Sequence, residues 1–85
     1  MSILNMNAES YRKYTQAEQP VLVEFSVPWC VYCRRLAPAL ESVAEEYQDT
    51  LVFGAVNIDD EPELAQSERI EVVPTLLIYQ NGQVL

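Results

Sequence analysis

The sequence predicts a small α/β domain in which a largely parallel β-sheet is covered by helices. Two observations lead to this fold class. Short apolar runs rich in β-branched residues indicate buried strands, and segments with helical periodicity separate these runs along the chain. Such alternation implies right-handed crossovers between strands of one sheet. We expect one domain over residues 1–85, because the chain contains no linker, internal repeat or low-complexity segment.

Four segments have the composition of strands, and a turn follows the last of them. They are SILNM at 2–6, which would form an edge strand, VLVEF at 21–25, LVFGAVNI at 51–58 and TLLIY at 75–79. The dipeptide Asn81-Gly82 is the strongest short signal for a β-hairpin. The returning strand would contain only residues 83–85.

The longest predicted helix begins directly after Cys30. Its apolar residues recur at the spacing i, i+4, i+7, i+8 and i+11, which places them on one face: Leu36, Leu40, Val43, Ala44 and Tyr47. Pro38 lies inside this helix, where it removes a backbone donor and clashes with the carbonyl of Arg34, so we expect a kink. The helix therefore has both Cys30 and Cys33 at its N-terminus.

Two shorter helices are predicted elsewhere in the chain. Asn7 is a suitable N-cap for a helix that has Tyr11 and Tyr14 on its inner side. A third helix would begin near Pro62, because proline favours the first helical position. The two aspartates at 59–60 suit the positive end of that helix dipole.

The composition describes an acidic globular chain. Of its 85 residues 49% are hydrophobic, and 13 acidic side chains outnumber 5 basic ones, which gives a formal net charge of −8. This charge repels phosphate backbones and anionic membrane surfaces, so we expect no nucleic-acid partner. No apolar run approaches the roughly 20 residues that span a bilayer, and the N-terminus lacks the basic flank and apolar stretch of a secretory signal. We therefore expect a cytoplasmic protein without a membrane partner.

Both cysteines of the chain lie in the segment PWCVYC at 28–33. A thiol attacks a disulfide as the thiolate, and the unpaired N–H groups and dipole of a helix N-terminus would stabilise that anion on Cys30. Cys33 follows one helical turn later on the same side, near enough to attack a mixed disulfide formed on Cys30. In a reducing cytosol such a pair indicates redox chemistry or metal binding rather than a static disulfide.

A single CxxC motif can also be half of a zinc site. Zinc takes four ligands, and this chain has no second CxxC and no histidine, so a metal site would need two chains or carboxylate ligands. We favour redox chemistry, and expect no metal, because the motif lies in a β-α-β context. An inert buried pair is the third interpretation.

Glu24 is the charged residue within VLVEF, and two interpretations of it are open. It could face solvent at a strand end, or it could be buried beneath the cysteine helix, as its apolar neighbours on both sides favour. Burial of a carboxylate is costly and raises its pKa, which would let Glu24 accept the proton of Cys33. We favour the proton-transfer interpretation.

In combination, these segments resemble the thioredoxin family. The resemblance rests on VLVEF, WCVYC, the helix with Pro38, VNIDDEPELA and VVPTLLIYQNG, in that order, and it covers Val21 to the last residue. It implies a thioredoxin-like three-layer α/β fold, with a central mixed β-sheet flanked by helices, and thiol–disulfide exchange as the activity. It implies no cofactor. The implied partners are disulfide-containing protein substrates and a flavoprotein thioredoxin reductase.

The resemblance also implies roles for single residues. By similarity Cys30 is the nucleophile and Cys33 the resolving thiol, with Glu24 in the position of the family's buried acid. The implied substrate-binding residues are Trp29, Val31, Tyr32, Val73 and Pro74. Pro74 would be the cis proline facing the cysteine pair, and the backbone before it would bind an extended substrate by strand addition. Without the resemblance, a proline at the start of a strand is ordinary.

Several positions depart from the thioredoxin pattern. Val31 and Tyr32 stand where thioredoxins typically have Gly-Pro. Glu24 replaces an aspartate, as in protein disulfide isomerase domains, and Ala55 replaces the lysine that commonly neighbours that acid. Three activities therefore stay open: disulfide reduction, disulfide isomerisation or oxidation, and peptide binding or assembly without turnover.

The C-terminus is the largest departure from the family. Thioredoxins complete their last strand and add a helix that covers one face of the sheet, whereas this chain stops at Leu85. We therefore expect a fold that is truncated at its C-terminus and leaves an apolar sheet face uncovered. Such a face would support either a homodimer or a chain shorter than its functional form.

Overall fold

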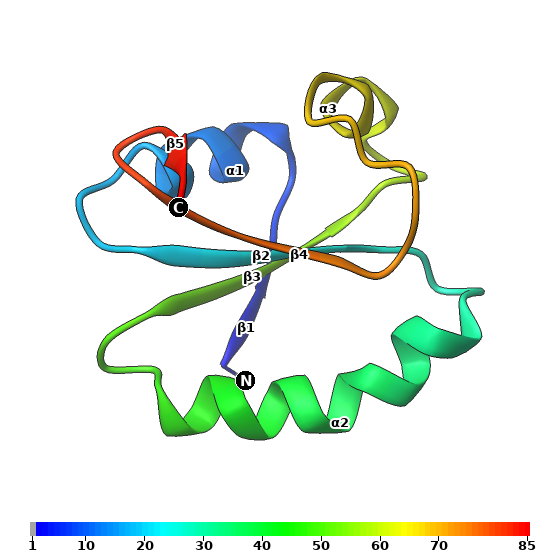
Figure 1. Cartoon of the computed structure of the whole chain (residues 1–85), viewed down its shortest axis with the longest axis horizontal. Coiled ribbons are helices and arrows are strands. Elements are labelled where there is room, and N and C mark those ends of the chain that lie inside the picture. The colour runs from blue at the N-terminus through cyan, green and yellow to red at the C-terminus, as the bar shows by residue number, and fades with distance from the viewer. Residues whose placement is uncertain (1) are drawn as a thin grey trace.

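The computed structural model describes residues 2–85, which form a five-stranded mixed sheet and three helices (Figure 1). The elements, in chain order, are β1 (Ile3–Asn5), α1 (Ala8–Thr15), β2 (Val21–Ser26), α2 (Val31–Glu46), β3 (Val52–Asn57), α3 (Pro62–Ser67), β4 (Thr75–Gln80) and β5 (Gln83–Val84). Each predicted strand and helix is present, so the predicted α/β class is confirmed.

The strand order of the sheet is β1-β3-β2-β4-β5. β3 pairs in parallel with β1 and β2, whereas β4 pairs antiparallel with both β2 and β5. The expectation of a largely parallel sheet was therefore wrong, and the mixed sheet implied by the family resemblance is confirmed. The connection formed by residues 58–74 returns to the edge of the sheet at which β3 ends, so β4 starts at that edge and runs antiparallel to β2.

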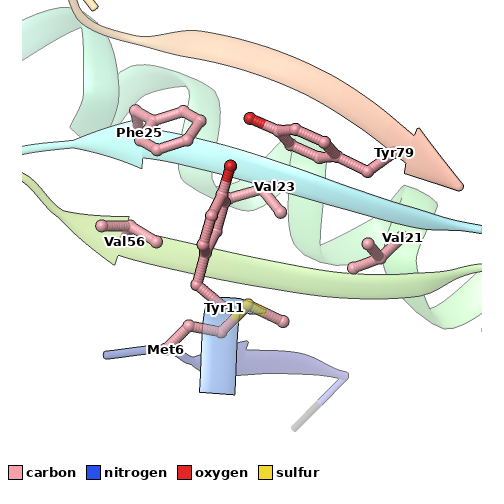
Figure 2. Close-up of a cluster of buried hydrophobic side chains, with 7 residues drawn as sticks. All are labelled: Met6, Tyr11, Val21, Val23, Phe25, Val56 and Tyr79. Carbon is pink, nitrogen blue, oxygen red and sulfur yellow. The ribbon is translucent and has the colours of Figure 1, made fainter. Parts of the chain in front are cut away.

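α1 and α3 cover one face of the sheet, and α2 covers the other (Figure 1). Between α1 and the sheet lies a cluster of buried side chains, shown in Figure 2: Met6, Tyr11, Val21, Val23, Phe25, Val56 and Tyr79. The Tyr11 ring meets Phe25 and Tyr79 edge-on, with ring centroids 6.2 and 5.5 Å apart. The Tyr79 hydroxyl donates to the Glu68 carboxylate after α3. This network therefore joins α1, α3 and β4.

The α2 face has a smaller core made by Leu40, Ala44 and Phe53. Val43 and Tyr47 were expected on the same inner face of this helix, but they are 42% and 50% exposed. Both side chains are exposed because the predicted apolar face of α2 is wider than the surface that the helix packs against the sheet. Helix α2 continues through Pro38, and its ribbon changes direction in its first half (Figure 1).

The predicted turn signals are confirmed at both ends of the chain. Asn7 caps α1, and its side chain accepts a hydrogen bond from the Ser10 backbone at 2.9 Å. Asn81 and Gly82 have φ angles of 54° and 80°, the left-handed pair that a tight hairpin requires. Their N–H groups donate to carbonyls at the end of α1, which fixes the β4–β5 hairpin against that helix.

The helices within residues 2–85 leave one strip of the sheet partly exposed. Strand alternation puts Leu77 and Tyr79 of β4 into the core below α1, so Leu76 and Ile78 point to the α2 side. They are 41% and 37% exposed there. No helix within residues 2–85 combines the length and the apolar character needed to cross a membrane.

Candidate active site

Cys30 lies at the junction between the loop after β2 and the first turn of α2. Its backbone is extended, as an N-cap requires, and its Sγ accepts a hydrogen bond from the Cys33 backbone N–H at 3.2 Å. Both cysteines are free thiols one helical turn apart. A cysteine therefore takes the place that a serine or aspartate usually has at a helix start, with its sulfur facing unpaired backbone donors.

The environment of Cys30 favours the thiolate. A hydrogen bond with the Cys33 side chain is the largest cause that lowers the pKa of Cys30, and backbone N–H groups of Cys33 and Tyr32 act in the same direction. The positive charge of Arg34 also lowers this pKa. Cys30 is thus the thiol of the pair that ionises first and the better nucleophile near neutral pH.

The environment of Cys33 favours the protonated thiol. Burial is the largest cause that raises the pKa of Cys33, followed by its hydrogen bond with Cys30, and the nearby Cys30 and Glu24 charges also raise it. The two sulfurs therefore differ in chemistry although they are only three residues apart. The thiolate is favoured on Cys30, and the protonated thiol is favoured on Cys33.

Glu24 lies on the α2 side of β2, because its neighbours Val23 and Phe25 point into the core below α1. It is only 8% exposed, which excludes the interpretation that it faces solvent at a strand end. Burial raises the pKa of Glu24 above its ordinary value. Its carboxyl group is therefore suited to hold a proton at a pH where an exposed glutamate is ionised.

Glu24 and Cys33 line one cavity of about 290 Å³. Its lining includes Asn5, Glu24, Cys33, Ala37, Ala55 and Asn57. Ala55 lies directly beside Glu24 in the β2–β3 register, and its small side chain leaves the cavity open. The lining is mostly apolar, but the polar side chains of Asn5, Glu24 and Asn57 can hold water in a space of this size, which gives Glu24 a route for proton exchange with solvent.

The segment before β4 meets the cysteines from the other side. The Val73–Pro74 peptide bond is cis, as the resemblance implied, and the Val73 carbonyl oxygen lies 3.9 Å from Cys30 Sγ. Val27, Ile58 and Val73 pack around the two thiols. Segments from β2, β3 and β4 therefore converge on the start of α2.

The remaining predicted site residues lie on the surface around Cys30. Trp29, Val31 and Tyr32 are 69%, 47% and 69% exposed, which is unusual for large apolar side chains. The Trp29 indole N–H donates to Asp59 Oδ2 at 2.8 Å, and this bond holds the ring beside the start of α3. The structure thus places every predicted site residue in one continuous region.

Two residues of this region were not predicted from the sequence as site residues. Asp59 was considered only for the helix dipole of α3, although its place after β3 was a signal, since the ends of β2 and β3 share one edge. Arg34 was considered only because its backbone carbonyl would clash with Pro38 in the helix. Its spacing of four residues from Cys30 was the signal for a cation near the thiol.

The fold and site define a class of protein: a dithiol protein with its reactive pair at a helix N-terminus, opposite a cis proline. The described residues, 2–85, contain no group of three or more histidine, cysteine, aspartate or glutamate side chains that could hold a metal ion. The residue pattern of the thioredoxin family model matches residues 2–85.

Relatives of known identity agree with this match. Thioredoxin of Porphyra purpurea is 34% identical over 84 residues, which are 98% of this chain and 78% of that protein. Thioredoxin 1 of Synechococcus elongatus is 42% identical over 75% of this chain and 60% of its own length. Chloroplastic thioredoxin M5 of Oryza sativa is 43% identical over 79% of this chain and 39% of its own length.

Solved structures show the same fold. The thioredoxin of Trypanosoma brucei brucei superposes with a TM-score of 0.93 over 99% of this chain and 74% of that one, at 25% identity. The thioredoxin of Malassezia sympodialis gives a TM-score of 0.93 at 24% identity, over 99% of this chain and 75% of that one. The chain belongs to the thioredoxin family. This membership and the close cysteine pair support thiol–disulfide oxidoreductase chemistry.

Proposed function

We propose that the chain reduces disulfides of protein substrates by dithiol–disulfide exchange. The observation that supports this most is the asymmetry of the two thiols. Hydrogen bonds and Arg34 favour the Cys30 thiolate, whereas burial keeps the proton on Cys33. A two-step exchange needs this difference, because the attacking thiol must ionise first and the resolving thiol must wait.

The exchange consists of two displacements that together transfer two electrons. In the first, the Cys30 thiolate attacks one sulfur of the substrate disulfide, a Cys30–substrate disulfide forms, and the other substrate sulfur leaves as a thiolate that takes a proton. In the second, the Cys33 thiolate attacks Cys30 Sγ, the Cys30–Cys33 disulfide forms, and the second substrate thiol is released. The substrate is reduced, and the dithiol is oxidised.

We assign Glu24 the role of the base in the second displacement. Its carboxylate shares the 290 Å³ cavity with Cys33, so a water molecule there can carry the Cys33 proton to it. The raised pKa of Glu24 brings it nearer to that of a thiol, which makes the transfer less unfavourable. We assign substrate binding to Val73 and Pro74 and to the exposed side chains of Trp29, Val31 and Tyr32.

Insulin reduction with dithiothreitol as electron donor tests this proposal directly. The reduced chain should accelerate the precipitation of insulin, and Cys30→Ser should abolish that effect. In a separate reaction without dithiothreitol, pre-reduced Cys33→Ser mixed with insulin should accumulate a mixed disulfide on Cys30, visible by intact mass, because the first displacement proceeds and the second cannot. Mixed disulfides that accumulate equally on Cys30→Ser would contradict the assigned order of the two thiols.

A redox titration in glutathione buffers separates reduction from isomerisation or oxidation. A midpoint near or below about −250 mV identifies a reductant suited to the cytoplasm, which is the compartment we propose. A midpoint above about −200 mV would identify an oxidase or isomerase instead. A pair that forms no intramolecular disulfide would leave peptide binding without turnover as the function.

Two partners follow from the proposal. Regeneration of the dithiol needs a reductant, and we propose a flavoprotein thioredoxin reductase in that role. We also propose that two copies associate through the uncovered strip of β4, since Leu76 and Ile78 expose apolar surface there. Sedimentation over a range of concentrations tests the second point, and a monomer at all concentrations would contradict it.

A further inference from the structure

Exposed apolar side chains surround the reactive thiol on several sides. Trp29 and Val31 are its sequence neighbours, and Tyr32 follows them on the first turn of α2. Val72, which is 71% exposed, precedes the Val73 carbonyl that lies 3.9 Å from Cys30 Sγ. A substrate cysteine that reaches Cys30 must therefore be flanked by side chains that tolerate contact with apolar surface.

The outer edge of this surface is negatively charged on the α3 side. Asp59 accepts the hydrogen bond from the Trp29 indole at 2.8 Å, which places its carboxylate at the edge of the apolar surface. Asp60 follows it and is exposed. Asp60, Glu61 and Glu63 line one pocket together with a single cation, Arg12, so negative charge exceeds positive charge on this side.

The inner part of the surface, at the thiol, has the opposite charge. The Arg34 guanidinium is close enough to Cys30 to lower the pKa of that thiol. Arg35 follows it on α2 and is exposed. Two of the five basic residues of the chain therefore lie directly after the CxxC motif. A cation immediately beside the attacked disulfide would be repelled here, whereas a cation further away would meet the aspartates.

We propose that the preferred substrate is an extended segment with apolar residues beside its reactive cysteine and lysine or arginine residues a few positions away, facing Asp59 and Asp60. This specificity rests on the proposed function, since it concerns the same reduction at Cys30. The net charge of −8 acts in the same direction at long range, because it attracts basic partners and raises their association rate.

Two synthetic peptides provide the test. Each is a disulfide-linked dimer with valines beside the central cysteine, and they differ only in a pair of lysines or a pair of glutamates three residues away. Pre-reduced protein is mixed with either peptide, samples are quenched with acid, and the released peptide thiol is quantified. The lysine peptide should react about tenfold faster at low ionic strength, and the ratio should fall towards one at about 0.5 M salt, where the Debye length is short.

A pair of variants separates a local effect from one of net charge. Asp60→Asn removes one charge beside the Trp29 surface. Glu46→Gln removes one charge at the far end of α2, about 22 Å along the helix from its first residue. The first variant should reduce the ratio of the two rates by about twofold to threefold, and the second should leave it unchanged.

Each outcome decides the proposal. Equal rates for the two peptides, or a faster glutamate peptide, would overturn the proposed specificity while the reduction of insulin remains. Equal effects of Asp60→Asn and Glu46→Gln would also overturn it, because only net charge would then matter. A chain that reduces neither peptide nor insulin would overturn the proposed function itself.

Discussion

The two faces of the sheet differ in how completely their side chains are buried. Below α1, the cluster of Figure 2 is closed, with Val21, Val23, Phe25 and Val56 at 0% exposure. On the α2 side, the same strands present a buried carboxyl group beside an open cavity, and further along they present apolar side chains that are more than one third exposed.

The two faces of the sheet therefore have different roles, the α1 face in stability and the α2 face in the chemistry of the site. The larger cluster of buried side chains lies on the α1 side, and its close packing fixes the strands, because such burial is the main driving force of folding. The α2 side accepts features that cost stability, namely the buried Glu24 and the cavity beside it. The closely packed α1 face thus fixes the part of the sheet near which Cys30, Glu24 and Val73 lie.

Truncation of one core residue on each face should show the largest contrast. Phe25→Ala should lower the free energy of unfolding by about 3 to 5 kcal/mol, since the ring is fully buried against Tyr11. Ile78→Ala, on the other face and 37% exposed, should lower it by about 1 kcal/mol or less. Urea unfolding measures both, and similar losses would contradict the proposed division between the faces.

Added volume at two neighbouring positions of β3 gives a second contrast. A methyl group at Gly54 would overlap the Met6 side chain on the closed face, so Gly54→Ala should cost about 1 to 3 kcal/mol. Ala55→Val points into the cavity instead and should change stability by less than about 1 kcal/mol. Thermal unfolding of the two variants measures the difference, and a Gly54→Ala protein as stable as the parent would show that Met6 is free to move.

Neutralising Glu24 should have a smaller effect on stability than Phe25→Ala, and the effect should depend on pH. Because burial raises the pKa of Glu24, the folded state binds more protons than the unfolded state between the ordinary and the raised value. The free energy of unfolding therefore falls as pH increases through this window. Glu24→Gln should remove that slope and be more stable than the parent at pH 7, with the advantage lost below pH about 4, where Glu24 is protonated in both states.

The same variant also separates a structural role from the proton-transfer role. If Glu24 accepts the Cys33 proton, Glu24→Gln should slow the release of substrate from the mixed disulfide at neutral pH while leaving the attack by Cys30 unchanged. Rapid-mixing kinetics with Cys33→Ser as the control for attack alone resolve the two steps. A parent and variant with equal release rates would leave Glu24 without a part in the exchange.

The sequence predicted the local elements of this protein well because their signals act over short distances. Asn7 caps α1 through bonds with Ser10, Pro62 suits the first turn of α3 through its fixed φ, and Asn81-Gly82 adopt the positive φ angles of a tight turn. Alternation and helical spacing likewise indicated which side chains face the core. The prediction failed for Val43 and Tyr47, since amphipathic spacing shows where a helix is apolar and not how far its partner extends.

By itself, the sequence thus determined the α/β class, the cysteine helix and, through its resemblance, the family. Only the tertiary structure decided the antiparallel direction of β4, the contact between Trp29 and Asp59, and the place of the Val73 carbonyl beside Cys30. These contacts join residues 30 and 43 positions apart. No local propensity encodes them, because they form only when the β2, β3 and β4 segments are brought to one edge of the sheet.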